Sequence, residues 1–133
     1  MNTIIIEHFN SLEASLIENN YIVSYKIIRR ETSYAECKIR FKVIFVDGSE
    51  AEFFEYLVFS NKTLSLSKYS FHWQDVKGNL IYRWDNAPHF PALPNPPHHR
   101  HNPDNSVVGI IKTPDIFDII KEIEKILEQS QKG

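Results

Sequence analysis

The spacing of apolar residues changes along the chain and predicts a helix at each end. Near the start, apolar residues recur at intervals of four, three and four, which places them on one helix face; they are Ile5, Phe9, Leu12 and Leu16. This helix is predicted over residues 3–18. Near the end, Thr113 is the expected N-cap and Pro114 the expected first helical residue. An apolar stripe then continues to Leu127, so a second helix closes the chain.

Between the predicted helices, apolar and polar residues alternate with the period of two that is typical of strands. In the clearest run, the odd positions from Ala35 to Phe45 are apolar, while the even positions are mostly charged. In the fourth run the alternation changes phase near Ser67 and Lys68, which predicts a β-bulge. The predicted strands are residues 21–30, 35–45, 50–59, a run that begins at residue 64, and 80–85.

These elements predict an α+β fold. We expect a five-stranded antiparallel meander sheet with the N- and C-terminal helices packed on one face. A long Pro- and His-rich loop follows the fifth strand, from Asn86 to about Asn105. It is too long for a simple connection, so it is functional or disordered. A chain of 133 residues fits a single domain, residues 1–133. A meander also leaves two edge strands exposed, through which a homodimer can form.

Composition narrows the classes of function. At 42% hydrophobic and 13% aromatic residues, the chain can bury a core. The net charge of −2 gives no general attraction to nucleic acid, so RNA binding would need a local basic patch. The chain has four glycines, and no glycine-rich phosphate loop is present. No apolar run approaches the roughly 20 residues of a membrane helix and no signal peptide is visible, so we expect a soluble, cytoplasmic protein without membrane contact.

The single cysteine, Cys37, excludes an internal disulfide and any cysteine-rich zinc site. It occupies an apolar position of an alternating strand. We therefore interpret it as a buried, unreactive thiol and not as a nucleophile.

Residues 69–101 concentrate the titratable side chains. Five of the six histidines lie here, together with both tryptophans and five of the seven prolines. Histidine changes charge near neutral pH and ligates metals, so this clustering predicts a functional site. The alternative is a set of surface histidines without a function.

The fourth and fifth strands can form a hairpin with a two-residue turn at Lys77 and Gly78. This register places polar side chains on one face and aromatic side chains on the other. The predicted pairs are Val76 with Asn79, Gln74 with Ile81, His72 with Arg83, and Ser70 with Asp85. The polar face can carry out acid–base chemistry.

Such a face suits RNA cleavage by transesterification. A neutral His72 would remove the proton from the ribose 2′-OH, and Arg83 would stabilise the charge that gathers on the phosphate. A loop histidine, His89 or His98, would supply the complementary acid or base. Glu55 would orient His72 or act as a base if its strand face is buried; otherwise it is an exposed carboxylate. Asp85 either joins this group or only hydrogen-bonds the loop backbone.

Two other functions remain open. His89, His98 and His101 can be combined into a three-histidine metal site, although the neighbouring Arg100 opposes a cation. That site would make the protein a metal-dependent nuclease or phosphodiesterase, whereas the first scheme needs no cofactor. A third reading is a non-enzymatic module whose aromatic and basic loop binds a protein or nucleic acid.

Three segments in a fixed order carry a family resemblance: YSFHWQ at residues 69–74, IYRWDNAPH at residues 81–89 and PHHRH at residues 97–101. Together they resemble the small bacterial and archaeal TumE family of toxin–antitoxin proteins, over about residues 33–127.

The resemblance implies a toxin whose partner is a small DNA-binding antitoxin. Toxins of this size are frequently ribonucleases, so the resemblance favours an RNA substrate. The candidate catalytic residues are His72, Arg83, Glu55, Asp85, His89 and His98. The candidate RNA-binding residues are Tyr69, Gln74, Asn86, Arg100 and His101.

Overall fold

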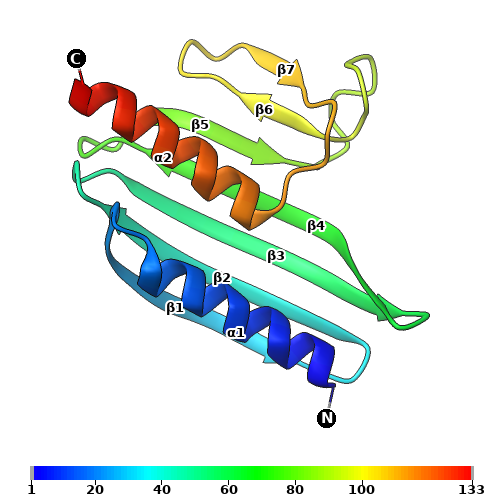
Figure 1. The fold of residues 1–133 in the computed structure, drawn as a ribbon. Helices are drawn as coiled ribbons and strands as arrows, with labels where there is room; N and C mark the ends of the chain where they lie inside the picture. Colours follow the sequence, from blue (N-terminus) through cyan, green and yellow to red (C-terminus); the bar gives the residue numbers. More distant parts are fainter. Residues whose placement is uncertain (1, 133) are drawn as a thin grey trace.

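Two helices lie on the same face of a seven-stranded antiparallel sheet in the computed structural model, which describes residues 2–132 (Figure 1). The strands follow one another across the sheet in chain order, from β1 at one edge to β7 at the other. The elements are α1 (Thr3–Glu18), β1 (Ile22–Thr32), β2 (Glu36–Phe45), β3 (Glu50–Ser60), β4 (Thr63–Gln74), β5 (Leu80–Asp85), β6 (His99–His101), β7 (Val107–Gly109) and α2 (Ile116–Lys132). The predicted α+β class and the placement of both helices on one face are confirmed.

The predicted number of strands is wrong. The segment expected to be a long loop contains β6, and β7 follows just after it in a stretch to which no strand was assigned; the two extend the sheet from five strands to seven. Each has three residues, too few for a period of two to appear in the sequence. They form because β6 pairs along the edge of β5, and β7 then pairs with β6. Tertiary pairing therefore creates strands that local pattern does not predict.

The predicted α1 agrees with the structure in both bounds, and the Asn2 side chain caps it by accepting from the Ile4 and Ile5 backbone N–H groups. The predicted start of α2 is wrong by two residues. The Asp115 carboxylate accepts from the Asp118 N–H at 2.8 Å and so acts as the N-cap. The Thr113 hydroxyl lies instead 3.2 Å from the Nε2 atom of His98.

The core lies between the helices and the sheet face that carries the odd-numbered residues of β2 and β3 and, from Tyr69 onward, of β4. Phe41 stacks on Phe53 at a centroid distance of 5.1 Å, and Phe53 packs on Phe71 at 5.6 Å. The buried Trp73 indole donates to the Ser49 hydroxyl at 3.0 Å, so the polar atom of this large side chain is satisfied. The alternation along the strands therefore separated the core face from the outer face.

The predicted bulge is confirmed. Tyr56 pairs with Lys68 and Leu57 with Leu66, which leaves Ser67 as the extra residue of β4. The bulge moves the odd-numbered residues from Tyr69 onward to the core face. It thereby places Ser70 and His72 on the face that is free of helices.

The predicted hairpin register is correct where it matters for the site and wrong beside the turn. His72 pairs with Arg83 and Ser70 with Asp85, but Gln74 pairs with Leu80 and not with Ile81. The two-residue turn is replaced by a longer one, because the Asp75 carboxylate accepts from the N–H groups of both Lys77 and Asn79 at 2.9 Å. A bulge between Trp73 and Gln74 absorbs the difference.

Cys37 provides a first test of the core. Its side chain is buried, and burial raises the pKa of the thiol to about 11. The thiolate is the reactive form, so the native protein should not react with a thiol reagent at neutral pH. We expect one reactive thiol per chain to appear only after unfolding in denaturant. Rapid labelling of the native protein would contradict this placement.

Candidate active site

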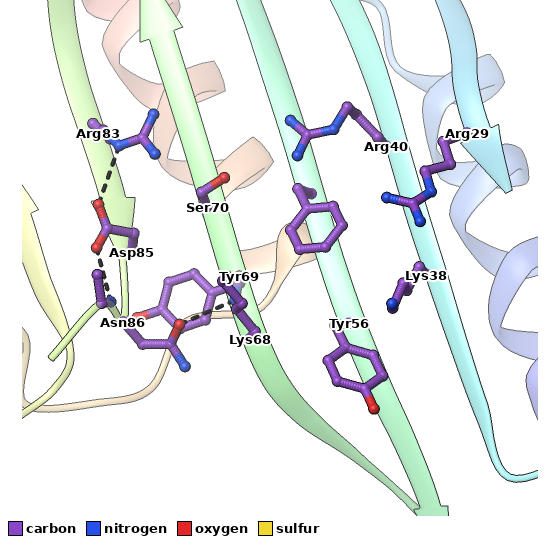
Figure 2. Close-up of a pocket in the computed structure, with 12 residues that line it drawn as sticks. Arg29, Lys38, Arg40, Tyr56, Lys68, Tyr69, Ser70, Arg83, Asp85 and Asn86 are labelled. Atoms are coloured by element: carbon purple, nitrogen blue, oxygen red, sulfur yellow. Dashed lines mark hydrogen bonds and ion pairs between the residues drawn. The ribbon is translucent and has the colours of Figure 1, made fainter. Parts of the chain in front are cut away.

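The sheet face turned away from the helices carries a groove of about 610 Å³ between β1 and β5 (Figure 2). Its lining includes two aromatic rings, from Phe54 and Tyr56, and the carboxylate of Asp85. The lining cations are Arg29, Lys38, Arg40, Lys68 and Arg83. This is a local basic patch on a chain whose net charge is −2, which is the feature that nucleic-acid binding would require.

Carboxylates compensate part of this positive charge. Arg29 pairs with Glu31 at 2.8 Å, and Arg40 pairs with Glu52 at 2.9 Å. Lys38 and Lys68 have no carboxylate within ion-pair distance among residues 2–132. These two lysines are therefore the cations most available to an anionic ligand.

Aromatic rings hold two of the cations in place. The Arg40 guanidinium lies 4.7 Å from the centroid of the Phe54 ring, and the Lys38 ammonium lies 5.0 Å from that of Tyr56. Such contacts orient a long side chain and reduce the entropy lost when it binds an anion. The groove therefore presents positive charges next to flat aromatic rings.

His72 lies beside Arg83 at the border of this groove. Its Nδ1 atom is 3.5 Å from the Arg83 Nη1 atom, and its Nε2 atom is 3.3 Å from the Gln74 Oε1 atom. Arginine can only donate, so Nδ1 is the acceptor; Nε2 then carries the proton and donates to the amide oxygen. This network describes a neutral imidazole whose Nδ1 lone pair faces the guanidinium. Both hydrogen bonds are long, so a ligand can replace them at small cost.

Asp85 is the centre of a second cluster, on β5 and β6. Its Oδ2 atom accepts from Arg83 Nε at 3.1 Å, and its Oδ1 atom accepts from the Ala87 backbone N–H at 3.0 Å. The Nε2 atom of His99 lies 2.9 Å from Oδ1, and that of His101 lies 3.5 Å from Oδ2. Burial lowers the pKa of His101, although the Asp85 charge acts in the opposite direction. Asp85 therefore does more than hydrogen-bond the loop backbone, since it also contacts Arg83 and two histidines; its catalytic role stays a prediction.

Glu55 lies on the opposite face of the sheet from His72. Its side chain is 1% exposed, and its Oε1 atom lies 2.9 Å from the Nε2 atom of His8 on α1. Glu55 therefore cannot orient His72 here; it belongs to the interface between α1 and the sheet. The His8 ring also meets that of Phe117 on α2, at a centroid distance of 6.4 Å.

Tyr69 lines part of the groove, whereas His98 is not among its lining residues. The Tyr69 ring is in the core, and its hydroxyl is 3.0 Å from the Nδ1 atom of His98. Burial raises the pKa of Tyr69 and lowers that of His98, so a phenol donates to a neutral imidazole. The His98 ring stacks on that of Tyr69, and its other nitrogen faces Thr113. This pair joins the β5–β6 loop to the segment before α2.

Of the remaining predicted residues, Asn86 lines the groove, whereas Arg100 and His89 do not. Arg100 lies on the helix side of β6, where its guanidinium covers the Tyr82 ring at 4.3 Å and pairs with Glu122 at 3.7 Å. Asn86 bridges the β4 bulge by binding the Tyr69 N–H and the Ser67 carbonyl. His89 is exposed in the loop after β5.

Among the described residues, the three histidines of the metal hypothesis, His89, His98 and His101, do not form a group of potential ligands; the group of three that does form is Asp85, His99 and His101.

Comparison with known proteins decides the family. A family model described as Toxin TumE matches residues 12–131. This chain belongs to the TumE toxin family. No curated protein and no solved structure matches it. The toxin is accordingly one component of a toxin–antitoxin system, and its family implies an antitoxin partner. In the part of the toxin that the structure describes, no helix is long and apolar enough to cross a membrane.

Sequence reasoning missed two parts of the toxin's candidate site. It did not single out His99, because His99 stands in a run with two other histidines, and the sequence does not show which of them is buried. It also treated Lys38 and Arg40 as the solvent side of an alternating strand. Their positions on the same face as His72 were implied by the pairing of β2, β3 and β4, but the groove depends on how five strands align.

Proposed function

We propose that this toxin is an endoribonuclease that binds RNA in the groove and cleaves it by attack of the ribose 2′-OH, without an organic cofactor. The observation that carries the proposal is the position of His72 beside Arg83, with 3.5 Å between Nδ1 and Nη1, next to a groove lined by cations and aromatic rings.

The mechanism uses the chain's own side chains. His72 Nδ1 takes the proton of the 2′-OH, whose oxygen then attacks the adjacent phosphorus. The bond from phosphorus to the 5′ oxygen breaks, and water in the open groove supplies the proton to that oxygen. Arg83 donates to the phosphate oxygens as negative charge develops on them. The Gln74 Oε1 atom accepts from the Nε2–H group of His72 and so holds the imidazole in the tautomer that this step requires.

RNA binding rests on the rest of the groove. Lysine and arginine side chains neutralise phosphates, and aromatic rings stack on unpaired bases. Lys38 and Lys68 supply charge without carboxylate partners. Phe54 and Tyr56 lie on the same sheet face on β3, between β2, which carries Lys38, and β4, which carries Lys68. This combination favours a flexible single strand over a rigid duplex.

The first experiment incubates the purified toxin with labelled total RNA in EDTA, in parallel with single-stranded DNA. We expect RNA to be cut into fragments that end in a 2′,3′-cyclic phosphate, while DNA stays intact because it has no 2′-OH. Persistence of the reaction in EDTA would support acid–base chemistry. Cleavage of DNA, or complete loss of cleavage in EDTA, would contradict the mechanism.

Removing the two lysines without carboxylate partners should weaken binding. For Lys38→Ala with Lys68→Ala, the slope of log K for single-stranded RNA against log salt should become less steep by about 0.7 for each lost contact. The matched control is Lys121→Ala with Lys125→Ala, which removes two exposed cations from α2 on the other side of the sheet. Equal salt slopes for the two double variants, measured by fluorescence anisotropy, would exclude the groove as the binding surface.

For the antitoxin, we propose a small DNA-binding protein, as is expected for the partner of such a toxin. Expression of the toxin with the neighbouring small open reading frame should yield a stable complex and relieve toxicity. A neighbour without a DNA-binding segment, or one that fails to relieve toxicity, would contradict this part of the proposal.

A further inference from the structure

Three side chains from β5 and β6 converge beside Arg83. The potential ligand atoms of Asp85, His99 and His101 all lie within 4.8 Å of one another. Asp85 and His99 are cross-strand partners, and His101 lies two residues further along the same face of β6. Two imidazole nitrogens and one carboxylate oxygen are ligands typical of zinc and neighbouring divalent transition metals.

His99 distinguishes this cluster from a simple ion pair. Its side chain is 1% exposed, and its Nδ1 atom lies 2.8 Å from the Pro97 carbonyl oxygen. A carbonyl oxygen only accepts, so Nδ1 carries a proton and donates. In the neutral ring the lone pair is then on Nε2. A ring nitrogen that donates to a backbone carbonyl while the other faces a cluster is the usual arrangement of a metal-ligating histidine.

The surroundings of Nε2 call for a cation. This atom lies 2.9 Å from Asp85 Oδ1, but the contact lacks the geometry of a hydrogen bond, and Nε2 has no hydrogen-bond partner within residues 2–132. A buried polar atom without a partner is costly. A metal ion bound by Nε2 and Oδ1 would give that atom a partner.

We propose that Asp85, His99 and His101 bind a divalent transition-metal ion, best represented by Zn²⁺. Ligand atoms about 2.0–2.2 Å from a tetrahedral zinc ion lie roughly 3.3–3.5 Å from one another. The contacts of 2.9 Å for His99 and 3.5 Å for His101 need only small side-chain adjustments to reach this spacing. Three protein ligands leave a coordination position for water.

The neighbouring residues suit this role. Arg83 binds Asp85 Oδ2 and so orients the carboxylate, leaving Oδ1 directed toward His99. The Phe90 ring packs against both imidazoles, at centroid distances of 4.8 Å and 5.9 Å, and so limits their movement. The positive charge of the Arg83 guanidinium repels a metal cation at this site. We therefore expect weaker binding than at a structural zinc site built from cysteines.

The ion would also fasten β6 to β5. Because β6 and β7 have three residues each, few backbone hydrogen bonds hold this hairpin on the sheet. A metal ligated from both β5 and β6 adds a cross-link at that junction. The proposal goes beyond ribonuclease activity and does not depend on it, since metal binding is measured without RNA.

The test titrates metal-free protein with Zn²⁺ by isothermal titration calorimetry and follows amide hydrogen exchange of residues 99–109. We expect one ion per chain and slower exchange in the loaded protein. His101→Ala changes a partly exposed ligand and should weaken Zn²⁺ binding at least about 10-fold. Asp85→Asn should do the same. The matched control is His89→Ala, an exposed histidine of the preceding loop, which should bind Zn²⁺ as the wild type does.

Three results would overturn the proposal: no Zn²⁺ binding by the folded wild type, unchanged binding in both His101→Ala and Asp85→Asn, or loss of binding in His89→Ala. His99→Ala removes a buried side chain and can fail to fold, so the two other ligands carry the test. If the protein binds Zn²⁺ as expected but leaves RNA intact, the metal site stands and the proposed function fails. If the protein cleaves RNA but does not bind Zn²⁺, the proposed function stands and the metal site fails.

Discussion

His72→Ala is expected to slow RNA cleavage by roughly 10²–10⁴-fold, the usual contribution of general acid–base catalysis. The imidazole lies beside the Arg83 guanidinium on the open face of β4 and β5 and is the proposed base for the 2′-OH, so its loss removes that base. The side chain is only partly buried, and folding should be preserved. The measurement is the single-turnover cleavage rate with enzyme in excess over labelled RNA.

The accompanying readout is RNA affinity. A catalytic base acts on the rate and not on ground-state binding, so the Kd of His72→Ala for RNA should stay within about a factor of 3 of the wild type. The matched comparison is the Lys38→Ala, Lys68→Ala double variant, which should lose affinity instead. Wild-type cleavage rates in His72→Ala would remove this residue from the mechanism, and an equal loss of rate and affinity would assign it to binding.

His8→Ala is expected to lower the free energy of unfolding by about 3 kcal/mol, because it leaves the Glu55 carboxylate buried without its partner. Glu55 is 1% exposed, and its contact with His8 at 2.9 Å links α1 to the centre of the sheet. Removing one member of a buried pair costs more than the pair contributes, since the remaining charge stays desolvated. Urea unfolding followed by tryptophan fluorescence gives the measurement.

A second substitution separates this effect from lost packing. Adding Glu55→Leu to His8→Ala removes the unpaired charge, so the double variant should recover most of the lost stability. The control is Glu31→Ala, which breaks the exposed pair with Arg29 and should leave the free energy of unfolding nearly unchanged. If His8→Ala were as mild as Glu31→Ala, the buried pair would not hold α1 on the sheet.

Local sequence pattern determined much of the fold. The intervals between Ile5, Phe9, Leu12 and Leu16 located α1 and its buried face, because a helix repeats every 3.6 residues. Alternation located the first five strands, and its change of phase located the bulge at Ser67. The pairing of His72 with Arg83 also followed from sequence, since hairpin partners lie close along the chain. The family followed from three short motifs in a fixed order.

Tertiary structure alone decided the remaining features. β6 and β7 exist because the edge of β5 offers unpaired backbone groups. The residue pattern of a three-residue segment does not show that such an edge lies beside it. Glu55 faces His8 and not His72, because the phase of β3 against β4 assigns the two residues to opposite faces.

The candidate site depends on the same long-range alignment. Asp85, His99 and His101 meet only after β6 has paired with β5, and the cationic groove needs five strands in register. Periodicity is a property of neighbouring residues, whereas a site is a property of contacts between residues that are distant in the chain. The sequence of this toxin therefore determined which faces are buried, and the assembled sheet determined which polar side chains meet.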